Sequence, residues 1–441
     1  MDAGTAGIGA VTTEVRLPLG LDRLRRLPGM SLALADQALV SGANFLFIIA
    51  VARSAGIEQF GLFSLSLAVV YFTGGLANAI LGLPISVLLP ERASEAVAPY
   101  LARLERVNRW IAVALVGLAV VFGAASGLWA IGLATALACA ARVASEVHRR
   151  IAYALQDGAR ALLIDVAGNA CLAIAAVALL LWPTRSFDAP VAMTAVAGCA
   201  ICGWAAGLML NRSALGGVAP EDFRAVAGRH WEFGRWGLGA SLALWSASQL
   251  YPFLVAGFLG LREVALLNGA MRLLGLANVL MQGIESYATP RLRRQLLTTD
   301  LRSYRSAWSG FATLGCLLVT PLMVAAMVWP EAILHATLGS EFVDGAQVLR
   351  IVAATQLFGF LARLATVGLN ALKEARPGFL GQVVCAVVTV AVGPLAVSRY
   401  GLDGAAWALL GNALINCIVV GVAFWLVLRR KAGLAKEGMV A

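Results

Sequence analysis

The sequence predicts an all-α integral membrane protein with about twelve transmembrane helices in two six-helix lobes. Three observations lead to this fold class: the composition, the recurrence of long apolar runs, and the distribution of Lys and Arg between those runs. Of the 441 residues, 60% are hydrophobic and only 13% are charged, and the mean hydropathy is +0.82. A soluble domain of this size has no interior large enough for so many apolar side chains, so most of the chain is expected in a bilayer.

Apolar runs long enough to cross a membrane recur along the whole chain, because about 20 helical residues cover the hydrocarbon layer. The second and eighth runs are longer than a perpendicular crossing needs and are expected to tilt or bend. The twelve predicted spans are 31–52, 62–89, 110–126, 131–153, 161–182, 189–210, 236–258, 265–289, 308–329, 348–371, 378–397 and 402–428.

Lys and Arg alternate strongly between the segments that separate these spans. One set of alternate segments holds 26 of the 34 basic residues and the other set holds 4. Basic residues stay on the cytoplasmic side, so both termini are predicted to be cytoplasmic. Membrane orientation and anionic lipid account for the net charge of +10, and no nucleic-acid partner is expected.

The two lobes are predicted from a weak internal repeat. At an offset of 204 residues, 44–62 aligns with 248–266, which joins the end of the first span to the end of the seventh. Six spans per half give both halves the same orientation, which is typical of parallel repeats about a pseudo-twofold along the membrane normal. The predicted organisation is a tail (1–30), an N-lobe (31–210), a cytoplasmic linker (211–235), a C-lobe (236–428) and a second tail (429–441).

Polar side chains form stripes on several predicted helices. At about 100° per residue, one face of span 348–371 collects Thr355, Gln356, Gly359, Arg363, Thr366 and Asn370. Span 265–289 shows a similar face with Asn268, Arg272, Gly275, Asn278, Gln282 and Ser286. Span 62–89 repeats it with Ser64, Tyr71, Gly74, Gly75, Asn78, Gly82 and Ser86.

Three arginines inside the spans are the main candidates for a function. Intramembrane charges usually line water-filled paths or substrate sites, so Arg142, Arg272 and Arg363 are predicted to face a cavity, although internal ion pairing and snorkelling remain alternatives. Arg350 lies near a span end and is expected to be structural. Asn78, Asn278, Gln282 and Asn370 are candidate substrate-binding residues together with the three arginines.

Acidic residues in the spans are candidates for coupling to an ion gradient. They are Asp36, Asp165 and Glu146, although Asp36 and Asp165 lie close enough to predicted span ends to be simply hydrated. Arg142, Glu146 and Arg149 share one face of a helix, which suits an intrahelical ion pair. No cofactor and no metal site is predicted, because the three histidines are scattered.

The opening stretch "ADQALVSGANFLFIIAVARSAGIEQFGLFSLSLAVVYF" resembles that of bacterial polysaccharide or O-antigen (Wzx-like) flippases of the multidrug/oligosaccharidyl-lipid/polysaccharide exporter superfamily. "EVHRRIAYALQDGARALLIDV", "GFLGLREVALLNGAMRLLG" and "TVGLNALKEARPGF" are similar to further family segments. The resemblance covers about 31–428, although lipid II flippases usually carry two more helices.

This resemblance implies a protein of the bacterial inner membrane that works by alternating access and is driven by an ion gradient. Its cargo would be an oligosaccharide on a polyprenyl diphosphate, its coupling ion a proton or sodium, and its partners a glycan polymerase and export machinery. The three arginines would then contact the diphosphate, since guanidinium groups bind phosphate oxygens in bidentate fashion.

Two other functions remain open from the sequence. A multidrug or cation antiporter of the same superfamily would share the fold but would favour an acidic cavity. A membrane-embedded glycan polymerase or ligase is the alternative from another class, and the exterior loop at about 330–347 offers little for catalysis. The expected protein is therefore not an enzyme.

Overall fold

The computed structural model describes residues 29–92, 94–155, 157–181, 187–215, 219–275, 291–296, 301–374 and 376–436, with isolated positions at 277, 281 and 288. Within these ranges the chain is helical and contains no strand. It divides into two compact units, Met1–Ser241 and Leu242–Ala441. The boundary between the units falls inside one helix, α8 (Phe223–Phe258), which begins within the predicted linker.

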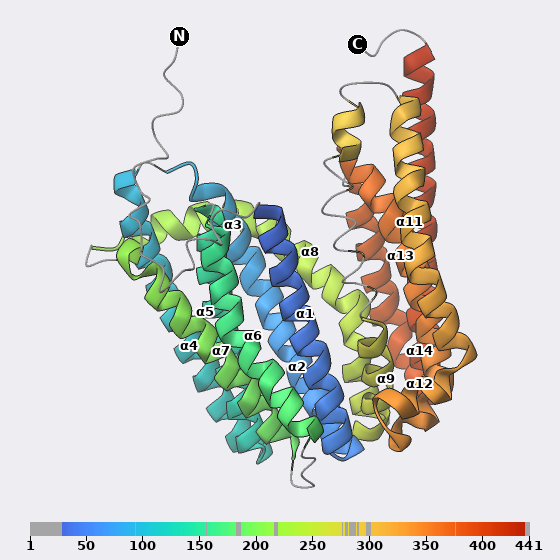
Figure 1. The fold of residues 1–441 in the computed structure, drawn as a ribbon, viewed down its shortest axis with the longest axis horizontal. Coiled ribbons are helices and arrows are strands. Elements are labelled where there is room, and N and C mark those ends of the chain that lie inside the picture. The colour runs from blue at the N-terminus through green and yellow to red at the C-terminus, as the bar shows by residue number, and fades with distance from the viewer. Residues whose placement is uncertain are drawn as a thin grey trace. The chain divides into compact units, whose positions relative to one another are not determined.

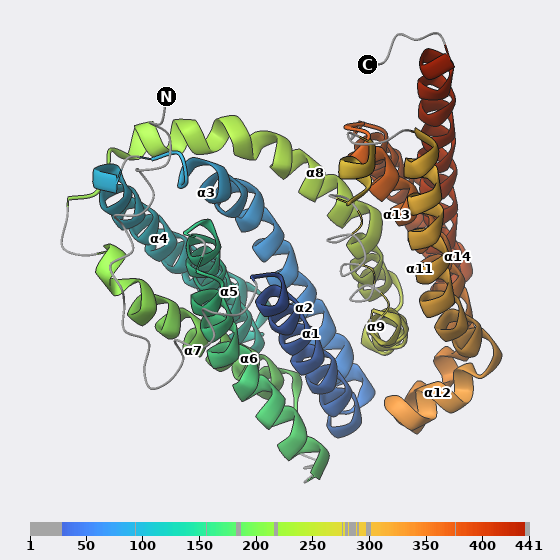
Figure 2. The same ribbon diagram turned by 45° about the horizontal axis from the view of Figure 1, so that its top comes forward.

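Unit 1 is built around α5, which contacts α2, α4, α6 and α7, while α1 lies along α6 (Figures 1 and 2). A tight apolar cluster forms where α4 and α5 pack, around Tyr100, Leu101, Val143, Val147 and Ile151. The helices of the unit are α1 (Gly29–Ser54), α2 (Ile57–Ala77), α3 (Leu83–Leu88), α4 (Ser94–Ser126), α5 (Trp129–Ala154), α6 (Gly158–Leu181), α7 (Ala189–Leu215) and the start of α8.

The long second span changes its helix type partway along. A π-helical turn, Asn78–Gly82, separates α2 from α3, and Pro84 follows at the start of α3. Proline has no N–H to donate to the carbonyl four residues earlier, which belongs to Ile80. His230 of α8 fills that role, because its Nδ1 donates to the Ile80 carbonyl oxygen at 2.9 Å.

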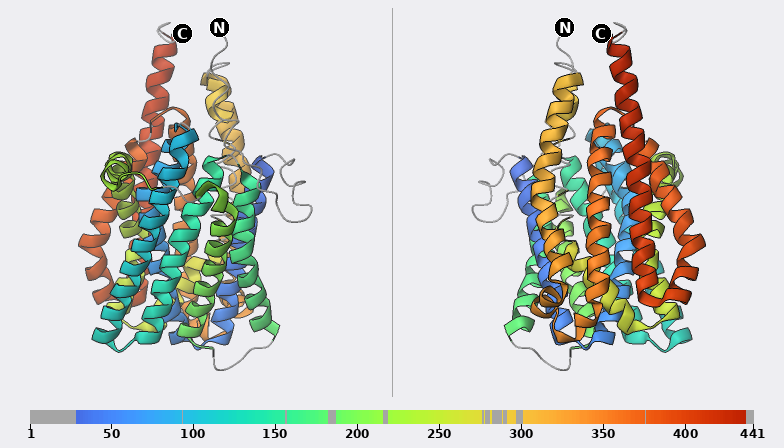
Figure 3. Two further views of the ribbon diagram at one scale, coloured as in Figure 1. Left: turned by 90° about the vertical axis from the view of Figure 1, so that its left-hand side faces the viewer. Right: turned by 90° about the vertical axis from the view of Figure 1, so that its right-hand side faces the viewer.

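Unit 2 is built around α13, which packs against α9, α11, α12 and α14. The unit contains the end of α8, α9 (Leu261–Leu274), α11 (Leu301–Val328), the short α12 (Pro330–Thr337), a 3₁₀ turn (Ser340–Gly345), α13 (Ala346–Ala371) and α14 (Arg376–Lys436). Figure 3 shows α11 and the end of α14 reaching past the end of α13. Gly401 interrupts α14 with a φ of 61°, at the break predicted between the last two spans.

In the described ranges, eight helices are long and apolar enough to cross a membrane. Seven correspond to single predicted spans, and the eighth, 376–432, contains the two predicted spans 378–397 and 402–428. The predicted span 265–289 begins as α9, but most of its second half lies outside the described residues.

Candidate functional site

A cavity of about 670 Å³ lies inside unit 2. Its walls come from α8, α11, α13 and α14, together with Ala277 and Met281. The central helix α13 supplies the polar wall: Thr355, Gln356, Gly359, Arg363, Thr366 and Asn370 all line the cavity. This is the stripe predicted from the helical period. The structure places the half-buried Arg363 on a cavity face, and the exposed Asn370 lies about two turns further along the same face of α13.

Helix α14 contributes a second polar wall that the sequence analysis missed. The same cavity is also lined by three amide residues of α14: Gln382, Asn412 and Asn416. The Asn412 amide donates to Thr389 Oγ1 at 2.6 Å and to the Ala247 carbonyl at 3.2 Å, which fixes this wall against α8. The spacing of Asn412 and Asn416, one helical turn apart, is the signal that would have indicated this face.

The described lining of this cavity carries positive charge and amides but no carboxylate. Arg363 is the charged residue among them, and Ser248, Thr355, Thr366 and the amide side chains supply donors and acceptors. Such a surface suits an anionic group attached to a hydroxyl-rich molecule, because guanidinium binds oxyanions and amides accept and donate to hydroxyls.

The other predicted arginines lie elsewhere. Arg142 of α5 lines a pocket of about 50 Å³ in unit 1, together with Asn44, Asp165 and Asn169. Arg272 lies half-buried near the end of α9 and lines neither of these two cavities.

The four amide residues predicted to bind substrate are also distributed over different places. Asn78 lies half-buried in the π-helical turn and lines neither cavity, whereas Asn370 lines the large one. Asn278 and Gln282 lie outside the described residues. Arg350, expected to be structural, is partly exposed and donates to the Met327 carbonyl at 3.3 Å.

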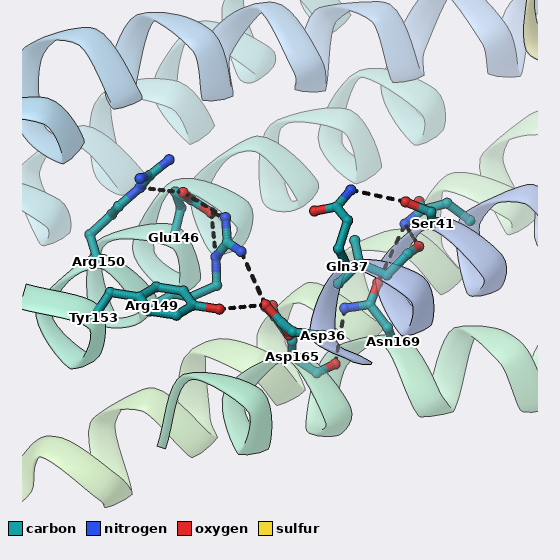
Figure 4. A network of polar contacts seen from close by, with 11 residues as sticks. Asp36, Gln37, Ser41, Glu146, Arg149, Arg150, Tyr153, Asp165 and Asn169 are labelled. Atoms are coloured by element: carbon teal, nitrogen blue, oxygen red, sulfur yellow. Dashed lines mark hydrogen bonds and ion pairs between the residues drawn. The ribbon is translucent and has the colours of Figure 1, made fainter. Parts of the chain in front are cut away.

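The three candidate coupling carboxylates meet around one arginine in unit 1 (Figure 4). Nitrogens of Arg149 lie 2.9 Å from Glu146 Oε2, 3.4 Å from Asp165 Oδ2 and 3.5 Å from Asp36 Oδ2. Asp36 comes from α1, Glu146 and Arg149 from α5, and Asp165 from α6. The cluster therefore ties three helices together through charge.

Burial separates the two explanations that the sequence left open for Asp36 and Asp165. Their residues are 3% and 4% exposed, so neither carboxylate is simply hydrated. Tyr153 donates its hydroxyl to Asp36 Oδ2 at 2.8 Å, an interaction that the sequence analysis did not anticipate. No pattern within one helix could reveal it, because the two residues are 117 positions apart.

The intrahelical ion pair predicted on α5 forms between Glu146 and Arg149, and Arg150 rather than Arg142 supplies its second cation. Glu146 pairs with Arg149 at 2.9 Å and with Arg150 at 2.9 Å, whereas Arg142, one turn earlier, lines the neighbouring pocket. Position i+4 rather than i−4 supplies the second cation, which agrees with the preference for an acid N-terminal to its base on a helix.

A chain of weaker polar contacts leads from this cluster along α1 and α6. Asn169 donates to the Asp165 carbonyl at 2.9 Å, and Asn44 donates to Asn169 Oδ1 at 3.4 Å. On the same face of α1, Gln37 donates to Ser41 at 3.0 Å (Figure 4). The cluster and the small pocket beside Arg142 thus form one polar region inside unit 1.

Comparison with known proteins gives a family match in one part of the chain and a fold match over nearly all of it. Residues 222–347 match the family described as polysaccharide biosynthesis protein. An inward-facing multidrug resistance MATE transporter of the MOP superfamily is 14% identical, with a TM-score of 0.71, and the match covers 90% of this chain and 96% of that one. The chain has the fold of a MOP-superfamily transporter.

Other solved structures match over a similar share of this chain with lower TM-scores. An outward-facing MATE transporter is 13% identical with a TM-score of 0.62, covering 92% of this chain and 96% of that one. A MOP superfamily transporter from Pyrococcus furiosus, described as having a binding pocket of reverse polarity, is 12% identical with a TM-score of 0.61. The match covers 91% of this chain and 95% of that one. No curated protein matches by sequence.

The MOP fold has twelve helices in two lobes, which confirms the predicted fold class. The resemblance to the polysaccharide branch of the superfamily is confirmed by the family match and the fold match together.

Proposed function

We propose that the protein translocates a polyprenyl-diphosphate-linked oligosaccharide across the bacterial inner membrane, by ion-driven alternating access, for surface or exopolysaccharide export. The observation that carries this proposal is the polarity of the unit 2 cavity. Its described lining combines the Arg363 guanidinium with many neutral amides and hydroxyls and contains no carboxylate.

The chemistry of the cargo explains why an arginine lies in this position. A diphosphate loses its hydration in the low-dielectric core of a membrane, and a guanidinium offsets its charge through paired N–H bonds to two oxygens. Gln356, Gln382, Asn370 and Asn416 present amides to the same space, where they can bind sugar hydroxyls. In this proposal Arg272, Arg142, Asn78, Asn278 and Gln282 contact the cargo at other stages of transport.

Coupling to an ion gradient is assigned to the cluster around Arg149. Asp36, Asp165 and Glu146 surround that guanidinium in a buried setting, where the charges depend on one another rather than on solvent. Uptake of a proton or a sodium ion by this cluster changes the charge that α1 and α6 present to α5. Such a change can bias a two-state transporter, because the ion binds the two states with different affinity.

Placement in the membrane follows from the charge distribution. We place both termini in the cytoplasm, because the Lys- and Arg-rich segments include both tails. A glycan polymerase and export machinery are the expected partners, since a translocated glycan must be polymerised and carried onward.

The fold match favours a second candidate, because several solved neighbours are titled multidrug transporters. A multidrug antiporter that binds cations would need anionic groups in its cavity, and the described lining of the unit 2 cavity offers none. The Pyrococcus furiosus neighbour, titled for reversed pocket polarity, indicates that this fold tolerates such a change of charge.

Transport by the purified wild-type protein in liposomes separates the two functions. A membrane-impermeant glycosidase, added outside the liposomes, would cleave only the glycan lipid that lies in the outer leaflet. We expect a polyprenyl-diphosphate oligosaccharide to equilibrate between leaflets in a protein-dependent way, while a cationic dye is not expelled under an imposed proton or sodium gradient. Dye expulsion without movement of the glycan lipid would contradict the proposal and favour the antiporter.

A further inference from the structure

A second cavity in unit 2, of about 450 Å³, lies between the start of α11 and the end of α14. It shares no lining residue with the cavity that contains Arg363. Figure 3 shows these two helix ends reaching beyond α13, so this cavity lies at the rim of the unit. Its lining residues are Arg302, Tyr304, Arg305, Ser306, Trp308, Ser309, Phe424 and Leu428.

The inner wall of this rim cavity is apolar and firmly held. The rings of Trp308 and Phe424 pack with their centroids 4.9 Å apart. Trp308 Nε1 donates to the Leu364 carbonyl at 3.0 Å, and the Tyr304 hydroxyl donates to the Gly368 carbonyl at 2.8 Å. Both anchors end on α13, so the aromatic wall keeps its shape without a ligand.

The outer rim carries two cations and two hydroxyls. Arg302 and Arg305 are exposed and lie one helical turn apart, with Ser306 and Ser309 on the following turn. The described lining contains no carboxylate to neutralise them. One residue beyond Leu428, α14 adds Arg429, Arg430 and Lys431, which raises the positive potential around the opening.

This combination of a basic rim and an apolar wall matches the two parts of a membrane lipid. The rim cavity lies where α11 and α14 leave their predicted spans, 308–329 and 402–428, at an end rich in basic residues. Phosphate headgroups occupy that level of a bilayer, and basic pockets between helix ends bind anionic heads there. A free anion would use the two arginines but would leave the aromatic wall exposed to water.

We propose that the rim cavity binds an anionic phospholipid of the surrounding bilayer. The lipid phosphate lies between Arg302 and Arg305, and the first part of its acyl chains covers Trp308, Phe424 and Leu428. This inference is independent of the cargo proposed above, because it requires only that unit 2 is embedded in a membrane. The bound lipid would hold α11 against α14.

The test measures lipid binding to the delipidated, purified full-length protein by native mass spectrometry and by the shift of its unfolding temperature. Phosphatidylglycerol is the probe, and phosphatidylcholine is the neutral comparison. For wild type we expect phosphatidylglycerol, and not phosphatidylcholine, to bind and to raise the unfolding temperature. The Arg302→Gln/Arg305→Gln variant should bind phosphatidylglycerol at least tenfold more weakly, while Arg302→Lys/Arg305→Lys, which keeps the charge, should recover part of the binding.

A matched control removes the same charge from another exposed basic surface. Arg224→Gln/Arg235→Gln alters two exposed arginines of α8 and should leave the phosphatidylglycerol effect unchanged. Equal weakening in this control would show that only overall charge matters and would overturn the site. Undiminished binding in Arg302→Gln/Arg305→Gln would do the same.

Two further probes distinguish other sources of phosphate. Inorganic phosphate at the same concentration should not compete with phosphatidylglycerol, and a polyprenyl diphosphate should bind the rim cavity less tightly than phosphatidylglycerol. Competition by inorganic phosphate would make this a simple anion site. Tighter binding of the polyprenyl diphosphate would make it a cargo site, and either result would overturn the proposal of a bilayer phospholipid.

Discussion

Arg149 holds three carboxylates from three helices at distances between 2.9 and 3.5 Å, and its side chain is 20% exposed. Charges removed from water in this way are costly unless each retains a partner. Asp36 and Asp165 depend on this guanidinium more than Glu146 does, since Glu146 also pairs with Arg150. The side chain of Arg149 therefore neutralises the carboxylates that α1, α5 and α6 bring together.

Replacing Arg149 with methionine should destabilise unit 1 strongly. The change leaves buried carboxylates without their common cation, and loss of one partner from a buried pair costs about 3–5 kcal/mol. The control is Arg109→Met, because Arg109 is 61% exposed and lies 3.8 Å from Glu105, a pair worth at most about 1 kcal/mol. Unfolding temperatures in detergent should fall clearly for Arg149→Met only; equal, small shifts would contradict this role.

His230 is a buried residue that is held in its neutral form. It lies before the predicted span 236–258, donates from Nδ1 to Ile80, and its Nε2 lies 2.8 Å from the Tyr100 hydroxyl. A carbonyl only accepts, so Nδ1 carries the proton and Nε2 accepts from Tyr100. Burial lowers the pKa of His230 below its ordinary 6.5, and Arg92 and Arg229 lower this pKa further, while the Ile80 carbonyl and Glu221 oppose them.

Acid should therefore weaken this part of unit 1. The unfolded chain takes up a proton below about pH 6.5, and the folded chain resists it, so the stabilisation present above pH 6.5 is lost as the pH falls. The loss reaches at most about 1.4 kcal/mol per pH unit for one group. Unfolding temperatures measured between pH 8 and 5.5 should fall more for wild type than for His230→Gln; parallel curves would show that His230 is not responsible.

At the scale of single elements, α5 and α13 occupy equivalent places. Each is the helix around which its unit packs, and each carries the arginines that line the cavities or hold the charged cluster. A central helix is surrounded on most sides, so a polar stripe on it has to face either a cavity or a partner. This explains why the stripe on α13 turned out to line a cavity.

Close packing around α13 depends on Gly368. A Cβ at this position would lie 2.5 Å from Cε2 of Phe424 and 3.1 Å from Nε1 of Trp308. The Tyr304 hydroxyl donates a hydrogen bond to the Gly368 carbonyl, which holds α13 against α11 and opposes a shift of α13 away from an added methyl group.

Gly368→Ala should lower the stability of unit 2 by about 1–3 kcal/mol, the usual cost of overpacking a core. Gly359→Ala on the same helix is the matched control, because a Cβ there would meet nothing within 4 Å. Alanine also favours a helix over glycine by about 1 kcal/mol, so this control should be neutral or stabilising. Equal changes in unfolding temperature for the two variants would contradict this expectation.

Helical periodicity explains how much of these elements the sequence could predict. The polar face of 348–371 follows from residue spacing within one helix, and the break near Gly401 follows from the bounds of the two apolar runs 378–397 and 402–428. The meeting of Asp36, Arg149 and Asp165 does not, because spacing along a helix contains no distance between helices. The polar wall on α14 could have been predicted, since Asn412 and Asn416 repeat at one turn.

At the scale of the whole molecule, hydropathy and the alternation of basic residues were sufficient to predict the fold class, because a bilayer imposes both on any multi-span helical protein. The shared MOP fold agrees with this prediction. A fold common to transporters of different cargo leaves the cargo to be inferred from the cavity. That inference depends on Arg363 and on the neutral amides around it.

The most direct test of this account compares wild type with Arg363→Ala and Arg363→Lys in liposomes that contain a polyprenyl-diphosphate oligosaccharide. An impermeant glycosidase measures the glycan that reaches the outer leaflet, at matched amounts of folded protein. We predict rapid flipping by wild type and partial activity for Arg363→Lys. For Arg363→Ala we predict a loss of roughly ten- to a hundredfold in rate, in line with the roughly 1.5–3 kcal/mol that a hydrogen bond to a charged group contributes. Flipping by Arg363→Ala at the wild-type rate would contradict the central claim.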